Sequence, residues 1–395
     1  MMKLKQSIYD VLCLLMGAGA LMGCVEEFEA DIPSSDTDLL VVEGTICSAQ
    51  VNKFILSRTQ PVQNTHGMVM EYDARVSVRG TDGSEYHAYP KGDGYSCKVG
   101  ELNPEVEYYL HIETDGEVYE SEPQKPLPTE KIADVCGVQN TPESAIDILV
   151  TPAEPFESDH ANYYSWRYDE TWEVYPEYKT AIYYDVEQRT AVMKSNQFPS
   201  HGWKDASGTS IMVGASSSYE GERIEKMKLY DIERTDERIF YRYSGLIQQR
   251  AISKAEYEYE LARRQAGSEM GGLFTPQPSA LPTNIHCLTS SKHVIGYVGC
   301  SLNTSKYRFF LDAPNYTIKR PPHFDTRIWL HAPSEDDCIA MVERGFFLCE
   351  WEDAEKSADH LLHTAWATKN QLDVRYQGAY IEVPDFWWLK ENVSY

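Results

Sequence analysis

The stretch that decides the fold is ARVSVRGTDGSEYHAY, residues 74–89. Apolar and polar residues alternate from Ala74 to Val78, which is typical of a strand with one buried face. The dipeptide Asp82-Gly83 then favours a type I′ turn, and the segment Glu85–Tyr89 returns as a second strand. This stretch therefore predicts a β-hairpin.

Similar strand patterns recur at short intervals on both sides of this hairpin. A second Asp-Gly turn stands at Asp115-Gly116, and prolines from Pro123 onward mark an exit linker. Short strands at this spacing favour an immunoglobulin-like or fibronectin-like β-sandwich over residues 39–128. The further strand segments are Leu39–Ile46, Lys53–Ser57, Gly94–Val99, Tyr108–Ile112 and Glu117–Glu120.

Residues 129–395 are expected to form a larger, β-rich α+β domain with a few helices. Alternation returns at Ala145–Val150 and at Tyr163–Tyr168. The chain contains 27 tyrosines and 8 tryptophans, residue types that favour β structure, whether in a core or on a binding surface. The predicted fold class is therefore mainly β.

One helix is expected near residues 253–266. Ser253 and Glu256 form a capping-box pattern, and Ile252 with Tyr257 can form the hydrophobic staple around it. The helical pattern stops near Gly267.

The N-terminal residues indicate export. Lys3 and Lys5 precede an apolar run that is too short to span a bilayer and that ends in small residues, as cleavable signal peptides do. The final Leu21-Met22-Gly23-Cys24 resembles a lipobox. Residues 1–23 are therefore expected to be a lipoprotein signal peptide, and Cys24 the residue that carries the lipid. An ordinary secretory signal with an incidental cysteine is the alternative.

Acidic residues follow this cysteine: Glu26, Glu27, Glu29 and Asp31. The flank resembles the surface-export signal of Bacteroidota lipoproteins, which implies a location on the outer membrane, facing the cell exterior. A plain acidic tether is the alternative. In both cases residues 24–38 are expected to link the lipid bilayer to the folded chain.

The chain is strongly acidic. Its formal net charge is −25, and it is −26 once residues 1–23, with two lysines and one aspartate, are removed. An acidic surface of this size argues against binding to nucleic acid or to anionic lipid. It is compatible with cationic or peptide ligands, although solubility alone is the simpler reason.

Seven cysteines follow Cys24, and export makes disulfides possible. Because the number is odd, at least one thiol is free or pairs elsewhere. Cys338 and Cys349, which are close in sequence, are the first candidate disulfide, and Cys287 with Cys300 is a weaker candidate. Zinc binding is not expected, since no CxxC occurs and no histidines cluster near the cysteines at ligand spacing.

No nucleophile elbow, HExxH, P-loop or Rossmann glycine pattern occurs, so neither enzymatic activity nor a cofactor is expected. His360 and His363 stand one turn apart, beside Asp359, on a helix predicted over residues 353–368. They could bind a metal, although two ordinary histidines on a helix face are the preferred interpretation.

A second polar cluster precedes this segment. Its members are His331, Glu335, Asp336 and Asp337. Here Ser334 and Asp337 are expected to cap the start of a helix, where the helix dipole favours an acid.

An irregular loop follows the predicted 253–266 helix. Glycines and prolines fix its backbone, and an aromatic ring within it needs burial or a ligand. Leu273, Phe274, Pro276 and Pro278 are therefore a candidate interaction loop, with packing against the second domain as the preferred alternative.

Several short motifs keep a fixed order along the chain. They are Val41-Val42-Glu43-Gly44, Tyr257 and Tyr259 in the helix, the Gly-Leu-Phe…Pro-Gln-Pro-Ser loop, Asn284-Ile285, Ile295-Gly296-Tyr297 and Pro384-Asp385-Phe386-Trp387. Together they resemble the DUF4249 family of Bacteroidota lipoproteins over nearly the whole mature chain. The resemblance implies a cell-envelope lipoprotein, often associated with TonB-dependent outer-membrane receptors. It implies no catalytic residues.

The expected function is that of a non-enzymatic lipoprotein that captures a ligand for a TonB-dependent transporter or covers its barrel. A structural or assembly factor of the outer membrane is the alternative, and an uncharacterised hydrolase is the least favoured interpretation.

Overall fold

The computed structural model describes residues 38–59, 69–154, 162–194, 197–268, 281–389 and 392–394. Strands dominate among these residues and helices are few, so the predicted mainly β fold is confirmed. Several predicted features lie outside the described residues: the signal peptide 1–23, Cys24 with residues 25–37 of the tether, and the loop with Leu273, Phe274, Pro276 and Pro278.

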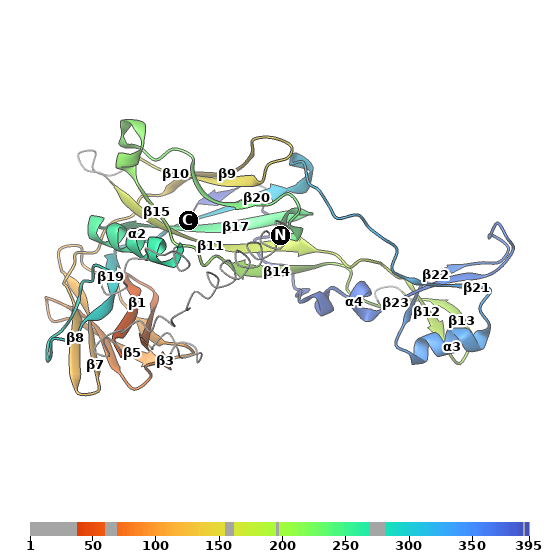
Figure 1. Cartoon of the computed structure of the whole chain (residues 1–395), viewed down its shortest axis with the longest axis horizontal. Helices are drawn as coiled ribbons and strands as arrows, with labels where there is room; N and C mark the ends of the chain where they lie inside the picture. The colour runs from red at the N-terminus through yellow and green to blue at the C-terminus, as the bar shows by residue number, and fades with distance from the viewer. Residues whose placement is uncertain are drawn as a thin grey trace, which may run out of the picture.

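The first sheet, drawn mostly in red and orange in Figure 1, is sandwich-like and nearly closes on itself. Its order is β18-β8-β7-β4-β5-β6-β2-β1-β19, with β3 paired to β2. The strands are β1 (Leu40–Cys47), β2 (Val51–Arg58), β3 (Val69–Met70), β4 (Arg75–Gly80), β5 (Glu85–Pro90), β6 (Tyr95–Lys98), β7 (Tyr108–Thr114), β8 (Glu117–Ser121), β18 (Ile285–Cys287) and β19 (Val294–Ser301). Their inner faces share one apolar core, which includes Phe54, Val78 and Leu110.

The predicted hairpin is present, because β4 and β5 pair as antiparallel neighbours. Its turn is not the predicted type I′: only Gly83 has a positive φ (+88°), and the Asp82 carboxylate accepts hydrogen bonds from the backbone and hydroxyl of Ser84. A turn with positive φ at both central residues occurs instead between β7 and β8, at Asp115 (+51°) and Gly116 (+76°).

Strands from the second half of the chain occupy both ends of this sheet. β19 pairs in parallel with β1 over its whole length, and β18 pairs with β8 at the opposite end. Asn284, just before β18, is 2% exposed. Its side chain accepts a hydrogen bond from the Val298 N–H and donates one to the Val298 carbonyl, both at 2.9 Å. One buried amide thus joins the two ends of the sheet.

The predicted domain boundary at residue 128 is therefore wrong in one respect. Residues 285–301 were assigned to the second domain, but they complete the first sheet. The physical reason is that alternation identifies a strand without identifying its partner, and β1 has a ladder edge that no neighbouring segment of sequence fills.

The second body is a β-sandwich built on two long strands, β11 and β17. Its larger sheet has the order β14-β11-β17-β20-β24, with β15 paired to β11, and its smaller sheet has the order β16-β10-β9. Ile148, Trp166 and Phe309 belong to the core that the two sheets share. The strands are β9 (Ile132–Gln139), β10 (Ile146–Pro152), β11 (Tyr163–Val174), β14 (Gly202–Ser207), β15 (Met212–Ala215), β16 (Met227–Ile232), β17 (Arg242–Ile252), β20 (Ser305–Asp312) and β24 (Val393–Ser394).

A small distal lobe projects from this sandwich, at the right of Figure 1. Trp366 is fully buried at its centre, with Tyr184, Met341 and Leu348 around it. The lobe consists of β12 (Ile182–Asp185), β13 (Thr190–Met193), β21 (Ile328–His331), α3 (Glu335–Glu343), β22 (Phe347–Glu352) and β23 (His363–Ala367).

The helix predicted at 253–266 is confirmed as α2 (Lys254–Ser268), and the Ser253 hydroxyl accepts the Glu256 N–H at 3.1 Å. The capping box is only half formed, because the Glu256 carboxylate bonds to Arg250 instead of the cap. The other short helices are α4 (Lys369–Leu372), η2 (Ser216–Ser218), η3 (Glu220–Glu222), η4 (Glu237–Ile239), η6 (Ala313–Asn315) and η7 (Val374–Gln377).

The helix predicted over residues 353–368 is wrong. Residues 363–367 form β23, the central strand of the order β21-β23-β22, and all five side chains are buried. His360 has a φ of +55°, which an α-helix does not allow. Burial on both faces of a central strand hides the alternation by which a strand is recognised in sequence.

We expect Asn284→Ala to lower the free energy of unfolding by about 2 kcal/mol, because the buried Val298 N–H loses its acceptor, whereas the Val298 carbonyl keeps a hydrogen bond from the Gln124 side chain at 3.1 Å. Denaturant unfolding measures the loss. His286→Ala is the matched control, since this exposed residue on β18 pairs only with exposed Glu122, and its effect should stay within about 0.5 kcal/mol. Equal effects of the two substitutions would contradict this account of sheet closure.

Candidate functional site

A polar cavity of about 430 Å³ lies where the first sheet, the larger sheet of the second sandwich and α2 meet. We call it the inter-sheet cleft. Its volume falls within the range of small-molecule sites. The lining residues that carry charge are Glu43 on β1, Arg167 and Asp169 on β11, Arg250 on β17, and Glu256, Glu260 and Arg263 on α2.

Helix α2 forms one wall because its aromatic residues contact both bodies. The rings of Tyr257 and Tyr163 on β11 lie 5.0 Å apart, and those of Tyr259 and Tyr297 on β19 lie 5.7 Å apart. The Tyr297 hydroxyl also lies 3.2 Å from the hydroxyl of Ser253, the residue that caps the helix. The helix therefore holds the two sheets at a fixed spacing.

A buried ion pair closes the floor of this cleft. The Arg250 guanidinium donates to both Glu256 oxygens at 3.1 and 2.5 Å, and their side chains are 14% and 4% exposed. Burial alone would lower the pKa of Arg250, but the Glu256 carboxylate outweighs it and raises that pKa. Gly299 on β19 leaves the necessary space, because a Cβ there would lie 2.2 Å from a Glu256 oxygen.

Other charges in the cleft are less well satisfied. Burial raises the pKa of Glu260, and neighbouring Glu256 adds to the rise while Arg263 opposes it. The Glu260 Oε2 atom is buried and accepts no hydrogen bond, and its ion pair with Arg263 Nε is long at 3.5 Å. Arg167 has no carboxylate within 4.0 Å in the described part of the chain. The cleft can therefore offer charged groups to a ligand.

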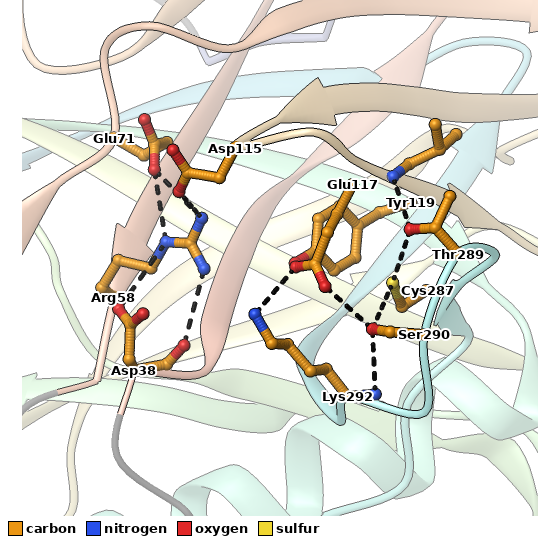
Figure 2. Close-up of polar contacts among 11 residues, drawn as sticks. Asp38, Arg58, Glu71, Asp115, Glu117, Tyr119, Cys287, Thr289, Ser290 and Lys292 are labelled. Carbon is orange, nitrogen blue, oxygen red and sulfur yellow. Dashed lines mark hydrogen bonds and ion pairs between the residues drawn. The ribbon is translucent and has the colours of Figure 1, made fainter.

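A second polar cluster lies at the edge of the first sheet, where β8 meets β18 (Figure 2). The Glu117 carboxylate accepts hydrogen bonds from Tyr119 at 2.6 Å, Lys292 at 3.0 Å and Ser290 at 2.9 Å. The hydrogen bond from Tyr119 is the largest cause, and that from Lys292 the next, of a Glu117 pKa lowered to about 2. The cluster ties the segment after β18 to β8.

Cys287 belongs to the same cluster, with its sulfur 3.2 Å from the Ser290 hydroxyl and 3.5 Å from the Thr289 hydroxyl (Figure 2). Burial would raise the pKa of this thiol, but the hydrogen bonds with Ser290 and Thr289 lower it below its usual value. Cys287 is a free, half-buried thiol. Such a thiol ionises more readily than an ordinary cysteine.

Arg58 anchors the neighbouring turn (Figure 2). Its guanidinium donates to Asp115 at 2.8 Å and to Glu71 at 3.2 Å, and its side chain is only 8% exposed. Because these acceptors come from separate strands and turns, the role of Arg58 is to hold the β7–β8 turn against β2.

The predicted disulfide between Cys338 and Cys349 does not form, and both residues are free thiols. Cys338 packs with Leu348 in the core of the distal lobe, whereas Cys349 packs with Tyr178 and Leu372 in a separate cluster. Consecutive residues of a strand point to opposite faces, so Leu348 and Cys349 direct these contacts to opposite sides of β22. Sequence proximity was therefore misleading.

Cys287 and Cys300, the weaker candidate pair, are also free thiols. Cys300 lies within the first core, and burial raises the pKa of its thiol to about 12. The pKa shifts of these two thiols are therefore opposite in direction, lowered for Cys287 and raised for Cys300.

The histidine pair predicted from the sequence is not brought together. His363 contacts His331 across β21 and β23, with the two Nδ1 atoms 2.6 Å apart, and its Nε2 lies 2.8 Å from Asp359. His360 takes no part in this contact. No group of three metal-ligating side chains occurs within the described ranges.

The second predicted polar cluster is structural. Ser334 caps α3 and forms the capping box with Asp337, as expected. Glu335 and Asp336 pair with Arg189 at 3.0 and 3.6 Å, on the exposed surface of the distal lobe.

Sequence reasoning did not identify the cleft as a site, although Glu43, Tyr259 and Tyr297, which line it, stand in the motifs of the family resemblance. Arg167 and Arg250 lie on strands that pair antiparallel, and Glu260 lies on a helix that follows in sequence. No motif connects them. The charged pattern at the start of α2 was a further indication, but we interpreted it only as helix capping.

We expect Glu117→Gln to destabilise the protein by about 1 kcal/mol at pH 7, because it removes a hydrogen-bonded carboxylate charge. The folded pKa is lowered from 4.5 to about 2, so this contribution is complete above pH 4.5 and is lost as the pH falls toward 2. Denaturant unfolding of both proteins at several pH values between 7 and 3 measures the difference.

Glu105→Gln is the matched control, because exposed Glu105 also pairs with a lysine at 3.0 Å but lies outside the cluster. A difference between wild type and Glu117→Gln that stayed constant from pH 7 to pH 3 would contradict the assignment.

We expect Cys287 to react first among the seven cysteines that the structure describes when the folded protein is treated with iodoacetamide near neutral pH. Its thiol is half-buried with a lowered pKa, whereas Cys300 is buried with a raised one. Peptide mass spectrometry after short exposure identifies the alkylated residue. Ser290→Ala should slow the reaction of Cys287, and labelling of Cys300 ahead of Cys287 would refute the prediction.

No helix in the described ranges is long and apolar enough to cross a membrane. Among curated proteins, none matches the chain. The family model described as "Domain of unknown function (DUF4249)" matches residues 25–307, which include the first sheet, most of the second sandwich, β12, β13 and α2. This match spans well over half of the sequence. The chain therefore belongs to the DUF4249 family.

Proposed function

We propose that this protein is a non-enzymatic lipoprotein of the outer membrane that captures a ligand in the inter-sheet cleft and works beside a TonB-dependent transporter. The observation that carries the proposal is the cleft itself. It is a polar cavity of about 430 Å³ with charged groups from four separate elements, β1, β11, β17 and α2. Convergent polar groups in one cavity are typical of ligand sites.

The proposal of a lipid anchor is based on the N-terminal sequence. Leu21-Met22-Gly23-Cys24 resembles a lipobox, and acidic residues follow it. The expected tether of residues 24–38 could reach at most about 50 Å if fully extended. A cleft on so short a tether stays close to the membrane, where a transporter could receive its ligand.

The partner role is supported by the distal lobe, which projects away from the two larger bodies (Figure 1). Large apolar side chains are exposed on the lobe and on the chain that leads to it, including Met193 (76%) and Phe324 (72%). Exposed apolar groups are favourable contacts for another protein. The resemblance described above adds that DUF4249 lipoproteins often accompany TonB-dependent receptors.

Affinity purification of the tagged full-length protein from detergent-solubilised outer membranes tests the proposal. We expect a TonB-dependent barrel to co-purify with the wild-type protein. Cys24→Ala should leave the melting temperature unchanged but should remove the protein from the membrane fraction and abolish co-purification, because only the lipid holds it there.

Cys47→Ala is the matched control, since Cys47 is a free cysteine that has no part in the proposed anchor. Recovery of no barrel with the wild-type protein would overturn the partner role, and membrane retention of Cys24→Ala would overturn the anchor.

A further inference from the structure

Three of the seven charged residues that line the inter-sheet cleft have close partners within the protein. Arg250 and Glu256 neutralise each other, and Asp169 accepts hydrogen bonds from Ser207 at 2.6 Å and from Gln248 at 2.9 Å. These side chains line the cavity, but their hydrogen-bonding groups are already occupied by partners within the protein. The chemistry of the ligand is therefore inferred from the charged residues without close partners.

Glu260 is the acid with spare capacity. Its Oε2 atom is buried without a hydrogen-bond donor, and its nearest cation, Arg263, lies at 3.5 Å. A carboxylate with an oxygen that has no donor is costly to bury, and the Glu260 side chain lines the cavity and is 20% exposed, so a cationic group in the cavity can approach it and would be favoured there. Glu43 on β1 adds a second carboxylate to the cavity wall and acts on Arg263 from a distance.

Arg167 is the base with spare capacity. It lines the inter-sheet cleft and also a smaller cavity of about 260 Å³. It is close enough to Glu260 to oppose the rise of that pKa, but no ion pair within 4.0 Å joins the two. An acid and a base thus face one cavity without contacting each other.

Opposite charges held apart in one cavity match a ligand that carries both charges. We propose that the cleft binds a short peptide with free termini, whose ammonium group lies at Glu260 and Glu43 and whose carboxylate lies at Arg167. Guanidinium groups bind carboxylates in a bidentate manner, and carboxylates accept the hydrogen bonds of an ammonium group. This inference rests on the proposed capture function and names its ligand class.

The tyrosines of the cleft fit the same ligand. Half-buried Tyr297 lines the wall between β19 and α2, and its ring lies 5.7 Å from that of Tyr259, which is only 4% exposed. Aromatic faces with hydroxyl groups contact both the apolar side chains and the backbone of a peptide. The charged ends fix the orientation of the peptide, and this wall accommodates its middle.

Calorimetric titration of the full-length protein in detergent tests the proposal with three probes: trialanine with free termini, trialanine acetylated and amidated at its ends, and maltotriose. We expect free trialanine to bind and the blocked peptide to bind at least about tenfold more weakly. Arg167→Gln and Glu260→Gln should each weaken binding of free trialanine by about tenfold or more.

Arg75→Gln is the control variant, because Arg75 is an exposed arginine on β4 with a long 3.7 Å ion pair, outside the cleft. It should leave the affinity within about twofold of wild type. The melting temperature of each variant, measured without ligand, shows whether it is folded.

Equal affinity for the free and blocked peptides would overturn the charge-recognition proposal, as would no binding of free trialanine at concentrations on the order of 10 mM. If only maltotriose bound, and if Arg167→Gln abolished this binding, the peptide proposal would be wrong. The cleft would then be the capture site for a different class of ligand. Co-purification of a barrel with Arg167→Gln tests the partner role separately, so the two proposals can fail independently.

Discussion

The parallel ladder between β1 and β19 is the constraint on which the rest of the structure depends. It joins residues 40–47 to residues 294–301, and it places β18 and Asn284 at the far end of the same sheet. The ladder also positions Tyr297 and Gly299, against which α2 packs. Without it the first sheet would have an open edge, and α2 would have no surface on this side.

The cleft follows from this arrangement. β17 leads directly into α2, so the sandwich supplies both the floor of the cavity and its helical wall. The buried pair of Arg250 and Glu256 then joins the end of β17 to the first turn of α2. Buried ion pairs contribute little net stability, but they disfavour packings that leave either charge without a partner. We interpret this pair as the element that fixes the angle between helix and strand, and through it the width of the cleft.

Part of the fold could be predicted from the sequence because the relevant interactions are local. The alternation at residues 74–89 required a hairpin, and the hydroxyl of Ser253 required a helix start, since both depend on neighbours within a few residues. The predictions failed where the position of a residue depends on a partner that is distant in sequence. The predicted 353–368 helix contains β23, whose buried residues pair with strands on both sides, and Cys349 faces away from Cys338 because of the pleat of β22.

The candidate site also combines features that the sequence specifies with features that depend on tertiary contacts. Net charge, the cysteine pattern and the short motifs of the family are properties of the sequence, and they determined the expected class of protein: an acidic, mainly β member of the DUF4249 family. Only the tertiary structure decided that Arg167, Glu43 and Glu260 face one cavity, because they lie on three elements whose contacts depend on the β1–β19 ladder and on the packing of α2. Periodicity specifies which face of an element is buried, whereas the partner of that face is selected by the whole chain at once.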